Sequence, residues 1–435
     1  MATITELRKQ LTEGAYKDTL AYLYCADEAG VAFQTARYLK ALDRFCEIYG
    51  DKGQEITLFS APGRTEVGGN HTDHQHGRVL AASVNLDVIA VVAKNDTDII
   101  TVESEGFAPD VVNHTELAPV ASEESTSAAL IRGTCAGFVE RGFAKGGFEA
   151  YTTSNVLKGS GLSSSAAFEV LIGTILNHLY NDGKIDAVTI AQNAQYSENV
   201  FFGKPCGLMD QTASSVGGFV GIDFEDTSKP IVKQVNFDFA HCGHNLVIVD
   251  TKGDHADLTP DYASIGNEMR AVAACFGKSV LREVDEAEFF AKIGELKGKL
   301  SDRALTRAIH FFSDNQLAAD ELAALEANDF DLFKKLILKS GASSFMYLQN
   351  AYSIQKPESQ GIPLGIAMTQ KMLEGKGAWR VHGGGFAGTM QAFVPVEMTE
   401  AYKKMVEGLF GEGACHVLSI RPVGAVQVTG FTVEK

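Results

Sequence analysis

Hydrophobic and polar positions follow two different periods along the chain, and each period predicts one kind of element. Spacings of three and four residues, as in RYLKALDRFCEIYG, predict helices, and β-branched runs such as VLAASVNLDVIAVVAKN predict strands. Helices are expected over most of 1–50 and 260–375, and over 127–142, 163–180 and 186–200, the last with Asp186 as N-cap. Strands are expected at 56–62, ending in Pro62-Gly63, at 148–153, 217–224 and 244–251, and as a paired set between 79 and 104.

The end of the chain has a pattern of its own. It predicts strand, strand, helix, strand, strand over 378–382, 388–394, 398–409 and 415–430. Helices and strands do not follow the regular βαβ order of a doubly wound sheet. The polar segment EDTSKP, with Pro230, is the best candidate for a boundary. The sequence therefore predicts an α+β protein of two domains that divide near 230–240.

Length and charge narrow the class of protein. The chain has 435 residues, long enough for two or three domains, and 45% of them are hydrophobic, as in ordinary globular proteins. Its 38 basic and 55 acidic residues give a net charge of −17. Such a surface repels phosphate backbones and anionic lipids, so neither a nucleic acid nor a membrane is expected as a partner.

The cysteines and the first residues concern location. Seven cysteines stand far apart without a CxxC pair, which is typical of reduced thiols. The first residues, MATITELRKQLTEG, lack the apolar run of a signal peptide, and no run of 18 apolar residues is present. We therefore expect a cytoplasmic protein that is a monomer or a weak homo-oligomer.

A glycine- and serine-rich segment, KGSGLSSSAAFEV, begins at Lys158 and leads into a predicted helix. Gly159 and Gly161 permit a close backbone turn, and the first amides of a helix carry a partial positive charge. These features suit a polyphosphate, and the serine hydroxyls can add hydrogen bonds or help to hold Mg²⁺. A helix capped simply by a serine is the structural alternative.

The segment 61–82 is rich in polar side chains and turn residues. Arginine, asparagine, acidic and histidine side chains in one loop suit a polyhydroxylated ligand, because each hydroxyl needs a donor and an acceptor. Two alternatives are a metal site built on His71, Asp73, His74 and His76, and a solvated polar loop.

Two further segments carry candidate chemistry. WRVHGGGFAGTMQAFVP contains Gly383, Gly384 and Gly385 between two predicted strands, which indicates a glycine turn approaching a ligand through its backbone; a hairpin without function is the alternative. Asp210, in KPCGLMDQTASS, is expected in a partly buried turn. Its carboxylate can act as a general base or orient a hydroxyl, and an ordinary Asx turn is the alternative.

Taken in order, these segments resemble those of the GHMP small-molecule kinases, and among them the galactokinases, over about residues 30–430. PGRTEVGGNHTDH, from Pro62, is similar to the family motif P-G-R-x-N-x-I-G-E-H-x-D-Y. GLSSSAA, from Gly161, matches the phosphate-loop motif in full. CGLMDQ, from Cys206, is similar to the family segment that carries the catalytic aspartate. The turn at Gly383 to Gly388 is similar to the family's third, glycine-rich motif. The resemblance implies the two-domain GHMP kinase fold, with domains 1–235 and 236–435 and the active site in the cleft between them.

The resemblance also implies a reaction: ATP-dependent phosphorylation of a sugar, foremost galactose, at its anomeric hydroxyl, with Mg²⁺. Sugar and ATP would be the partners. Asp210 would face that hydroxyl, with Arg64 beside it. The other implied roles are sugar contacts by Glu66, Asn70, His71, Asp73 and Tyr262, ATP contacts by Gly159, Ser160, Gly161, Leu162, Ser163, Ser164, Ser165 and Ala166, a glycine motif at Gly383, Gly384 and Gly385, and Mg²⁺ held by Ser165 and Glu198.

The first motif departs from the family pattern at three positions. Glu66 stands where the family has Asn, Asn70 where it has Glu, and His74 where it has Tyr. The family Glu is associated with the 6-hydroxyl end of the sugar, so Asn70 would lessen the repulsion of a 6-carboxylate. Galacturonokinases share this loss and an H-x-D-H-Q string, which makes a galacturonokinase, or another GHMP sugar 1-kinase, the leading alternative.

Two other classes of function stay open. A non-catalytic sugar sensor would bind sugar and ATP without turnover; such sensors lack residues within the Ser-Ser-Ala stretch, and here Ser164, Ser165 and Ala166 are present. A metal-dependent hydrolase built on the histidines would hold zinc.

Overall fold

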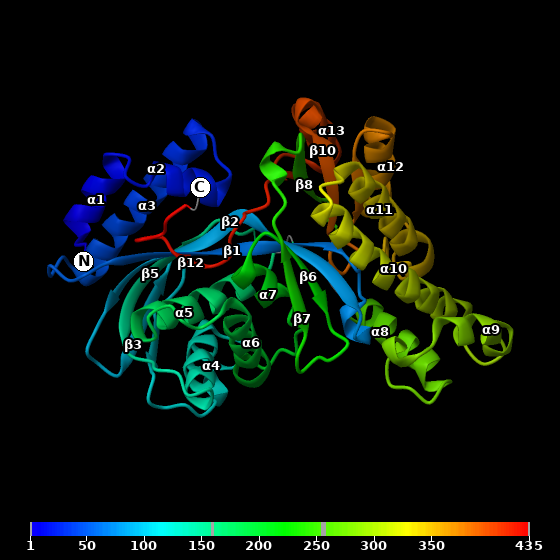
Figure 1. Ribbon diagram of the computed structural model, residues 1–435, viewed down its shortest axis with the longest axis horizontal. Helices are drawn as coiled ribbons and strands as arrows, with labels where there is room; N and C mark the ends of the chain where they lie inside the picture. Colours follow the sequence, from blue (N-terminus) through cyan, green and yellow to red (C-terminus); the bar gives the residue numbers. More distant parts are fainter. Residues whose placement is uncertain (1, 158–160, 254–257, 434–435) are drawn as a thin grey trace.

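A computed structural model describes residues 2–157, 161–253 and 258–433, which form two sheets covered by helices (Figure 1). The larger sheet has eight strands in the order β12-β1-β2-β5-β3-β4, with β6 also on β2 and β7 on β6. The strands are β1 (Thr57–Gly68), β2 (Arg78–Lys94), β3 (Ile99–Ser104), β4 (Asp110–Asn113), β5 (Phe148–Ser154), β6 (Phe219–Asp223), β7 (Ile231–Val235) and β12 (Val426–Gln427).

Helices cover both faces of this sheet. On one face lie α1 (Ile4–Thr12), α2 (Lys17–Tyr24) and α3 (Glu28–Tyr49), and on the other lie α4 (Ser127–Glu140), α5 (Ser164–Tyr180), α6 (Ala187–Ser197) and α7 (Met209–Val216) (Figure 1). Adjacent strand residues point to opposite faces, so Leu58 packs under α1–α3 while Phe59 packs under α4–α6. This alternation explains why β1 and β2 are buried over nearly their whole length.

The smaller sheet has the order β11-β8-β10-β9. Its strands are β8 (His244–Asp250), β9 (Ala378–Val381), β10 (Thr389–Pro395) and β11 (Cys415–Leu418). The helices that pack on it are α11 (Phe330–Ser343), α12 (Gly361–Leu373) and α13 (Thr399–Phe410). A separate helical cluster contains α8 (Thr259–Ala274), α9 (Glu286–Leu296) and α10 (Asp302–Glu326). One face of this sheet packs on α12 and α13, and the other joins the core of the larger sheet through Leu246, Ile248 and Phe393.

Most predicted helices and strands are present, including the helix capped by Asp186, whose side chain accepts from the amide of Thr189. Two strand predictions were wrong. First, β1 does not end at Pro62 but runs on to Gly68, because a register shift between Pro62 and Arg64 accommodates a residue that cannot donate to the ladder. Arg64 and Glu66 therefore lie on a strand and not in a turn-rich loop.

The other error concerns strand order. The strands between 79 and 104 are not paired with each other, because β5 lies between β2 and β3 and runs parallel to β3. EDTSKP is the turn of a hairpin between β6 and β7, so it lies within the larger sheet. Asp210, expected in a turn, lies in the first turn of α7. Of the described residues, none belong to a helix long and apolar enough to cross a membrane.

Candidate active site

The phosphate-loop segment is described from Gly161 onward, and Gly159 and Ser160 lie outside the described residues. Gly161 (φ +72°) and Ser163 (φ +53°) are both left-handed, and α5 begins at Ser164. Ser163 occupies the N-cap position, yet within residues 161–253 its hydroxyl caps no amide and donates instead to the Asp210 carboxylate. Ser163 therefore does not cap α5 in the way that the serine of a serine-capped helix does.

Arg64 and Asp210 form the centre of the site. Arg64 Nε donates to Asp210 Oδ1 at 2.7 Å, and Nη1 donates to the carbonyl oxygen of Gly161. The backbone amide of Arg64 donates to Leu162 O at 3.0 Å. Gly63 permits this approach, because a Cβ there would lie 2.8 Å from Leu162 O. The strand, the loop and α7 therefore converge on one carboxylate.

The environment of Asp210 fixes its ionisation. Burial alone would raise the pKa of this carboxyl, but the charge and hydrogen bond of Arg64, with the hydroxyl of Ser163, lower it below its ordinary value. The same pairing raises the pKa of Arg64 against its burial. Asp210 is therefore an anion at neutral pH, and its side chain is 31% exposed, so it remains accessible to a ligand.

The glycine turn between β9 and β10 binds three side chains of the candidate sugar site through consecutive carbonyl groups. Asn70 Nδ2 donates to the carbonyl oxygen of Gly383 at 2.8 Å, His71 Nε2 to that of Gly384 at 3.1 Å, and the Tyr262 hydroxyl to that of Gly385 at 3.1 Å. Burial, with His74 nearby, lowers the pKa of His71 to about 4, so this ring is neutral.

The Asn70 amide lies inside the protein. Besides Gly383, its Nδ2 donates to Glu66 Oε1 at 2.6 Å, and its Oδ1 accepts from Asn350 Nδ2 at 2.7 Å and from Ser344 Oγ at 3.3 Å. The residue has no exposed surface. Asn70 was predicted to contact the sugar, but in this structure protein atoms already satisfy its whole side chain.

Asp73 and His74 lie at the edge of the same site. A Cβ on Gly207 would lie 3.2 Å from Asp73 Oδ2, which places Asp73 against the segment that leads to Asp210. The His71 and His74 rings are 5.8 Å apart. The described residues include no group of three or more His, Cys, Asp or Glu side chains arranged to hold a metal ion, so the histidine string does not form the suggested metal site.

Glu198 faces the interior at the end of α6, where it is 3% exposed. Its Oε2 accepts from Gln211 Nε2 at 2.8 Å, and its Oε1 lies 3.4 Å from Lys204 Nζ. Gln211 also donates to Glu169 Oε2 at 3.2 Å. Glu169 Oε1 and Gln211 Oε1 are buried and have no hydrogen-bond partner among the residues that the structure describes. These oxygens are the kind of donor that Mg²⁺ prefers.

Sequence reasoning missed three residues of this region: Glu169, Gln211 and Arg380. A signal for Glu169 was present, because it is the only charged residue in the helix after Ser165 and lies four residues, about one turn, beyond it. Arg380 is buried and donates to the carbonyl of Val67 at 2.5 Å. Nothing in its flanking sequence indicated this contact with β1.

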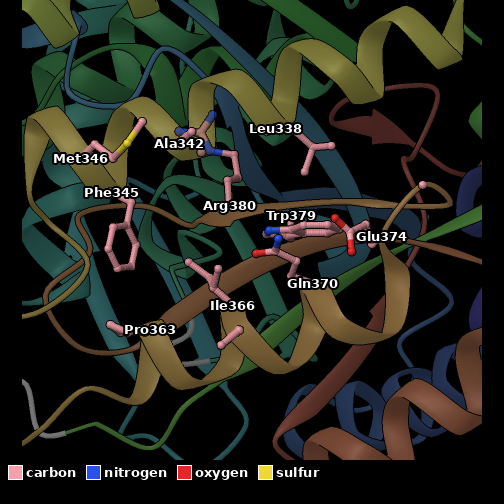
Figure 2. A pocket seen from close by; sticks show the side chains of 13 residues that line it. Leu338, Ala342, Phe345, Met346, Pro363, Ile366, Gln370, Glu374, Trp379 and Arg380 are labelled. Carbon is pink, nitrogen blue, oxygen red and sulfur yellow. The ribbon is translucent and has the colours of Figure 1, made fainter.

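Two hollows lie near these elements. One of about 310 Å³ opens beside the phosphate loop and is lined by Ser164, Ser165 and Phe168 of α5, with Phe107 and Phe202. A second, of about 530 Å³, lies between α11 and α12 and is lined mainly by apolar side chains, including Trp379 (Figure 2). The first hollow adjoins the start of α5, next to Ser163, and the second is lined by Arg380, whose guanidinium is held by β1 and β9 carbonyls.

Comparison with known proteins agrees with this geometry. Residues 43–94 match the galactokinase galactose-binding signature, and residues 129–218 match the GHMP kinases N-terminal domain. The crystal structure of Lactococcus lactis galactokinase complexed with galactose is similar, with a TM-score of 0.74 and 23% identity, covering 90% of this chain and 100% of that one. Methanococcus jannaschii mevalonate kinase has a TM-score of 0.59 and 13% identity, covering 84% and 98%. The fold is that of the GHMP kinases.

Curated relatives narrow the class. The galactokinase of Streptomyces coelicolor is 30% identical over 373 residues, which cover 85% of this chain and 92% of the relative. That of Actinobacillus pleuropneumoniae serotype 3 is 30% identical over 376 residues, covering 84% and 92%. The chain belongs to the galactokinase family.

Proposed function

We propose that the protein transfers the terminal phosphoryl group of ATP to the anomeric hydroxyl of galactose and releases galactose 1-phosphate and ADP. The observation that carries this proposal is the joint contact of Asp210 with Arg64 and Ser163. It links an ionised carboxylate directly to the segment that resembles a phosphate loop. A kinase needs the acceptor hydroxyl and the phosphoryl group at one point, and this contact supplies that point.

ATP would bind along residues 159–166. The amides at the start of α5, which Ser163 does not cap, would face its phosphates, where the helix dipole favours negative charge. The hollow lined by Ser164, Phe168 and Phe202 adjoins this segment and suits a flat, apolar ring, so it would receive the nucleobase.

Ser165 and Glu198 would hold Mg²⁺. The orphaned oxygens of Glu169 and Gln211 beside Glu198 support a cation there. The ion would supply positive charge to the phosphate oxygens. Gln211 follows Asp210 directly on α7 and donates to Glu198, so one helix carries both Asp210 and a residue that holds a proposed cation donor in place.

The sugar would lie between Asp210 and the glycine turn. His71, Asp73 and Tyr262 would contact its hydroxyls, and the carbonyls of the glycine turn hold two of them in position. Glu66 and Asn70 would form the wall of this site. We propose a division into domains 1–235 and 236–435 with the sugar in the cleft between them, because the first part supplies Asp210 and Arg64 and the second supplies Tyr262 and Gly383–Gly385.

The reaction would be a direct, in-line transfer. Asp210, kept ionised by Arg64, would accept the hydrogen bond of the anomeric hydroxyl and either remove or orient its proton. Arg64 would also stabilise negative charge on the transferred group. Positioning and charge stabilisation supply most of the catalysis in such reactions.

The proposal is tested by ADP production with a panel of neutral sugars and uronic acids, with the product identified by NMR. We expect galactose as the best substrate and phosphate at C1. Folded protein that binds galactose and ATP without releasing ADP would show a sensor instead.

A cytoplasmic location is part of the proposal, because widely spaced, unpaired cysteine positions are typical of a reducing compartment.

A further inference from the structure

We propose that Glu66 carries the negative charge of the sugar site and selects neutral sugars over uronic acids, with Asn70 as its positioning residue. This inference rests on the proposed function, since it concerns the sugar that the kinase accepts. Taken alone, the lack of charge on Asn70 favoured galacturonate as the substrate. With Glu66 as the charged residue, the same position supports a neutral sugar.

The first observation is that the two departures from the sugar motif touch each other. The motif has Asn at position 66 and Glu at position 70, and this chain has the reverse order. The two side chains are hydrogen-bonded, with Asn70 Nδ2 2.6 Å from Glu66 Oε1. One amide and one carboxylate are therefore retained at this place, so the charge that Asn70 lacks is present four residues earlier.

The second observation is that the carboxylate of Glu66 is held on one side and unpaired on the other. Its Oε1 accepts from Asn70 and lies 3.6 Å from Arg380 Nη2. Arg380 is itself fixed by the carbonyls of Val67 and Val381. Across the three described ranges, the Oε2 atom of Glu66 has no hydrogen-bond partner, yet it is not among the fully buried atoms without one. This oxygen is available to a ligand.

The third observation is that Glu66 lies on the same face of β1 as Arg64, which binds Asp210. Arg64 and Glu66 are two residues apart in a regular part of β1, so both side chains lie on the same face. Two residues of a strand span about 7 Å, close to the length of a hexose ring with its substituents. A sugar with its anomeric hydroxyl at Asp210 therefore has its opposite end beside Glu66. A uronic acid has its carboxylate at that end, where Glu66 repels it.

The role of Asn70 follows from its burial. All of its side-chain contacts are with protein, including the carbonyl of Gly383 and the amide of Asn350. It therefore acts through Glu66, whose carboxylate it orients. A glutamate at position 70 would place a second carboxylate against Glu66.

The test compares Glu66→Gln, Asn70→Glu and the exchange variant Glu66→Asn/Asn70→Glu. With Glu66→Gln we expect the ratio of kcat/KM for galacturonate to that for galactose to rise at least tenfold. Asn70→Glu should lose most of its kcat/KM with galactose. The exchange variant should recover at least half of the decrease in log(kcat/KM) that Asn70→Glu causes. A purely structural role for Asn70 predicts no such rescue.

Two further readouts keep the outcome decisive. The melting temperature and the Kd for ATP verify that each variant is folded, and calorimetric binding of both sugars replaces kinetics if turnover is absent. Absence of ADP release by the unaltered protein would contradict the proposed function alone. An unchanged sugar ratio in Glu66→Gln, in kinetics or in binding, would overturn the role of Glu66, and an exchange variant no better than Asn70→Glu would overturn that of Asn70.

Discussion

The Asp210 carboxylate accepts one hydrogen bond from a guanidinium and one from a hydroxyl, and these donors come from segments far apart in the sequence. Arg64 lies on β1 and Ser163 immediately precedes α5. An ionised group held in this way is preorganised, since its donors are fixed before any ligand arrives. The chemistry of the site therefore depends on a few individual side chains, each of which can be tested separately.

Replacing the carboxylate tests its role directly. Asp210→Asn keeps the shape but removes the charge, so we expect kcat to fall by about 10² to 10⁴-fold, the range for a lost general base. The Kd for ATP should stay within about twofold, because the amides of α5 are untouched. ADP release and nucleotide binding measure the two quantities. Asp182→Asn is the matched control, since that residue is exposed and left-handed, a conformation that Asn tolerates; near-normal kcat in Asp210→Asn would refute the assignment.

Arg64 should control the pH dependence. In the folded protein Arg64 lowers the pKa of Asp210, so the carboxylate is ionised above that pKa and activity is lost as pH falls through it. Arg64→Gln removes the main cause that lowers the pKa of Asp210, and the burial that remains raises this pKa. The substitution should lower kcat/KM at every pH. In addition, the acid limb of its pH profile should move to higher pH. Arg44→Gln, at an exposed position, is the control, and an unmoved acid limb would contradict the pairing.

Residue-level prediction succeeded where a local motif carried the information. Arg64 and Asp210 were predicted as neighbours from the family resemblance, and the structure brings them into contact. The burial of Asn70 could not be predicted, because its partners Asn350 and Ser344 are more than 270 residues away in sequence. An exposed and a buried asparagine look alike in a polar segment.

Among the elements, the turn between β9 and β10 links the two parts of the chain through its carbonyls. A Cβ at Gly384 would lie 2.5 Å from the ring of Tyr262. Gly384→Ala must therefore displace the tyrosine, and we expect KM for galactose to rise about tenfold while KM for ATP changes little. Steady-state kinetics with each substrate varied in turn measures this.

The matched control for this turn is Gly408→Ala, in α13. No atom lies within 4 Å of the added methyl group there, and alanine favours a helix over glycine by about 1 kcal/mol. Its KM values should be unchanged. Equal increases of both KM values in Gly384→Ala would indicate a general distortion and contradict the specific role of the turn.

Element prediction failed where tertiary pairing overrides local signals. Pro62 signals the end of a strand, but β2 continues to pair with β1 on both sides of it. The strand β7 is short and mostly exposed and was not predicted, so EDTSKP, the turn before it, resembled a boundary segment. The order of β2, β5 and β3 depends on contacts distant in sequence, which no local periodicity records.

At the scale of the whole molecule, the end of the chain returns to its beginning. β12 pairs with β1, and Arg421, just before it, is buried against Asp87 of β2, with Nη1 3.3 Å from Oδ2. Asp87 also binds Arg37 and the Tyr24 hydroxyl. The chain thus forms the smaller sheet first and then returns, so that its last residues pair with and stabilise the larger sheet. Both sheets contribute residues to one hydrophobic core.

Removing the ion pair between Arg421 and Asp87 should destabilise the whole fold. Arg421→Met leaves Asp87 with Arg37 as its partner, so we expect the free energy of unfolding to fall by about 3 kcal/mol, the low end for breaking a buried ion pair. Urea unfolding can be followed by the fluorescence of Trp379, the single tryptophan, and by far-UV circular dichroism. Both transitions should shift together. Arg44→Met is the surface control, and a shift in only one signal would show that the two parts unfold independently.

The most direct test of the account is a crystal structure of the protein with galactose and a non-hydrolysable ATP analogue. We predict that an Asp210 carboxylate oxygen lies within hydrogen-bond distance, about 3 Å, of the anomeric hydroxyl, with the terminal phosphorus in line beyond it. The triphosphate should rest on the amides that begin α5. A sugar bound with its anomeric carbon away from Asp210, or a nucleotide bound elsewhere, would contradict the account.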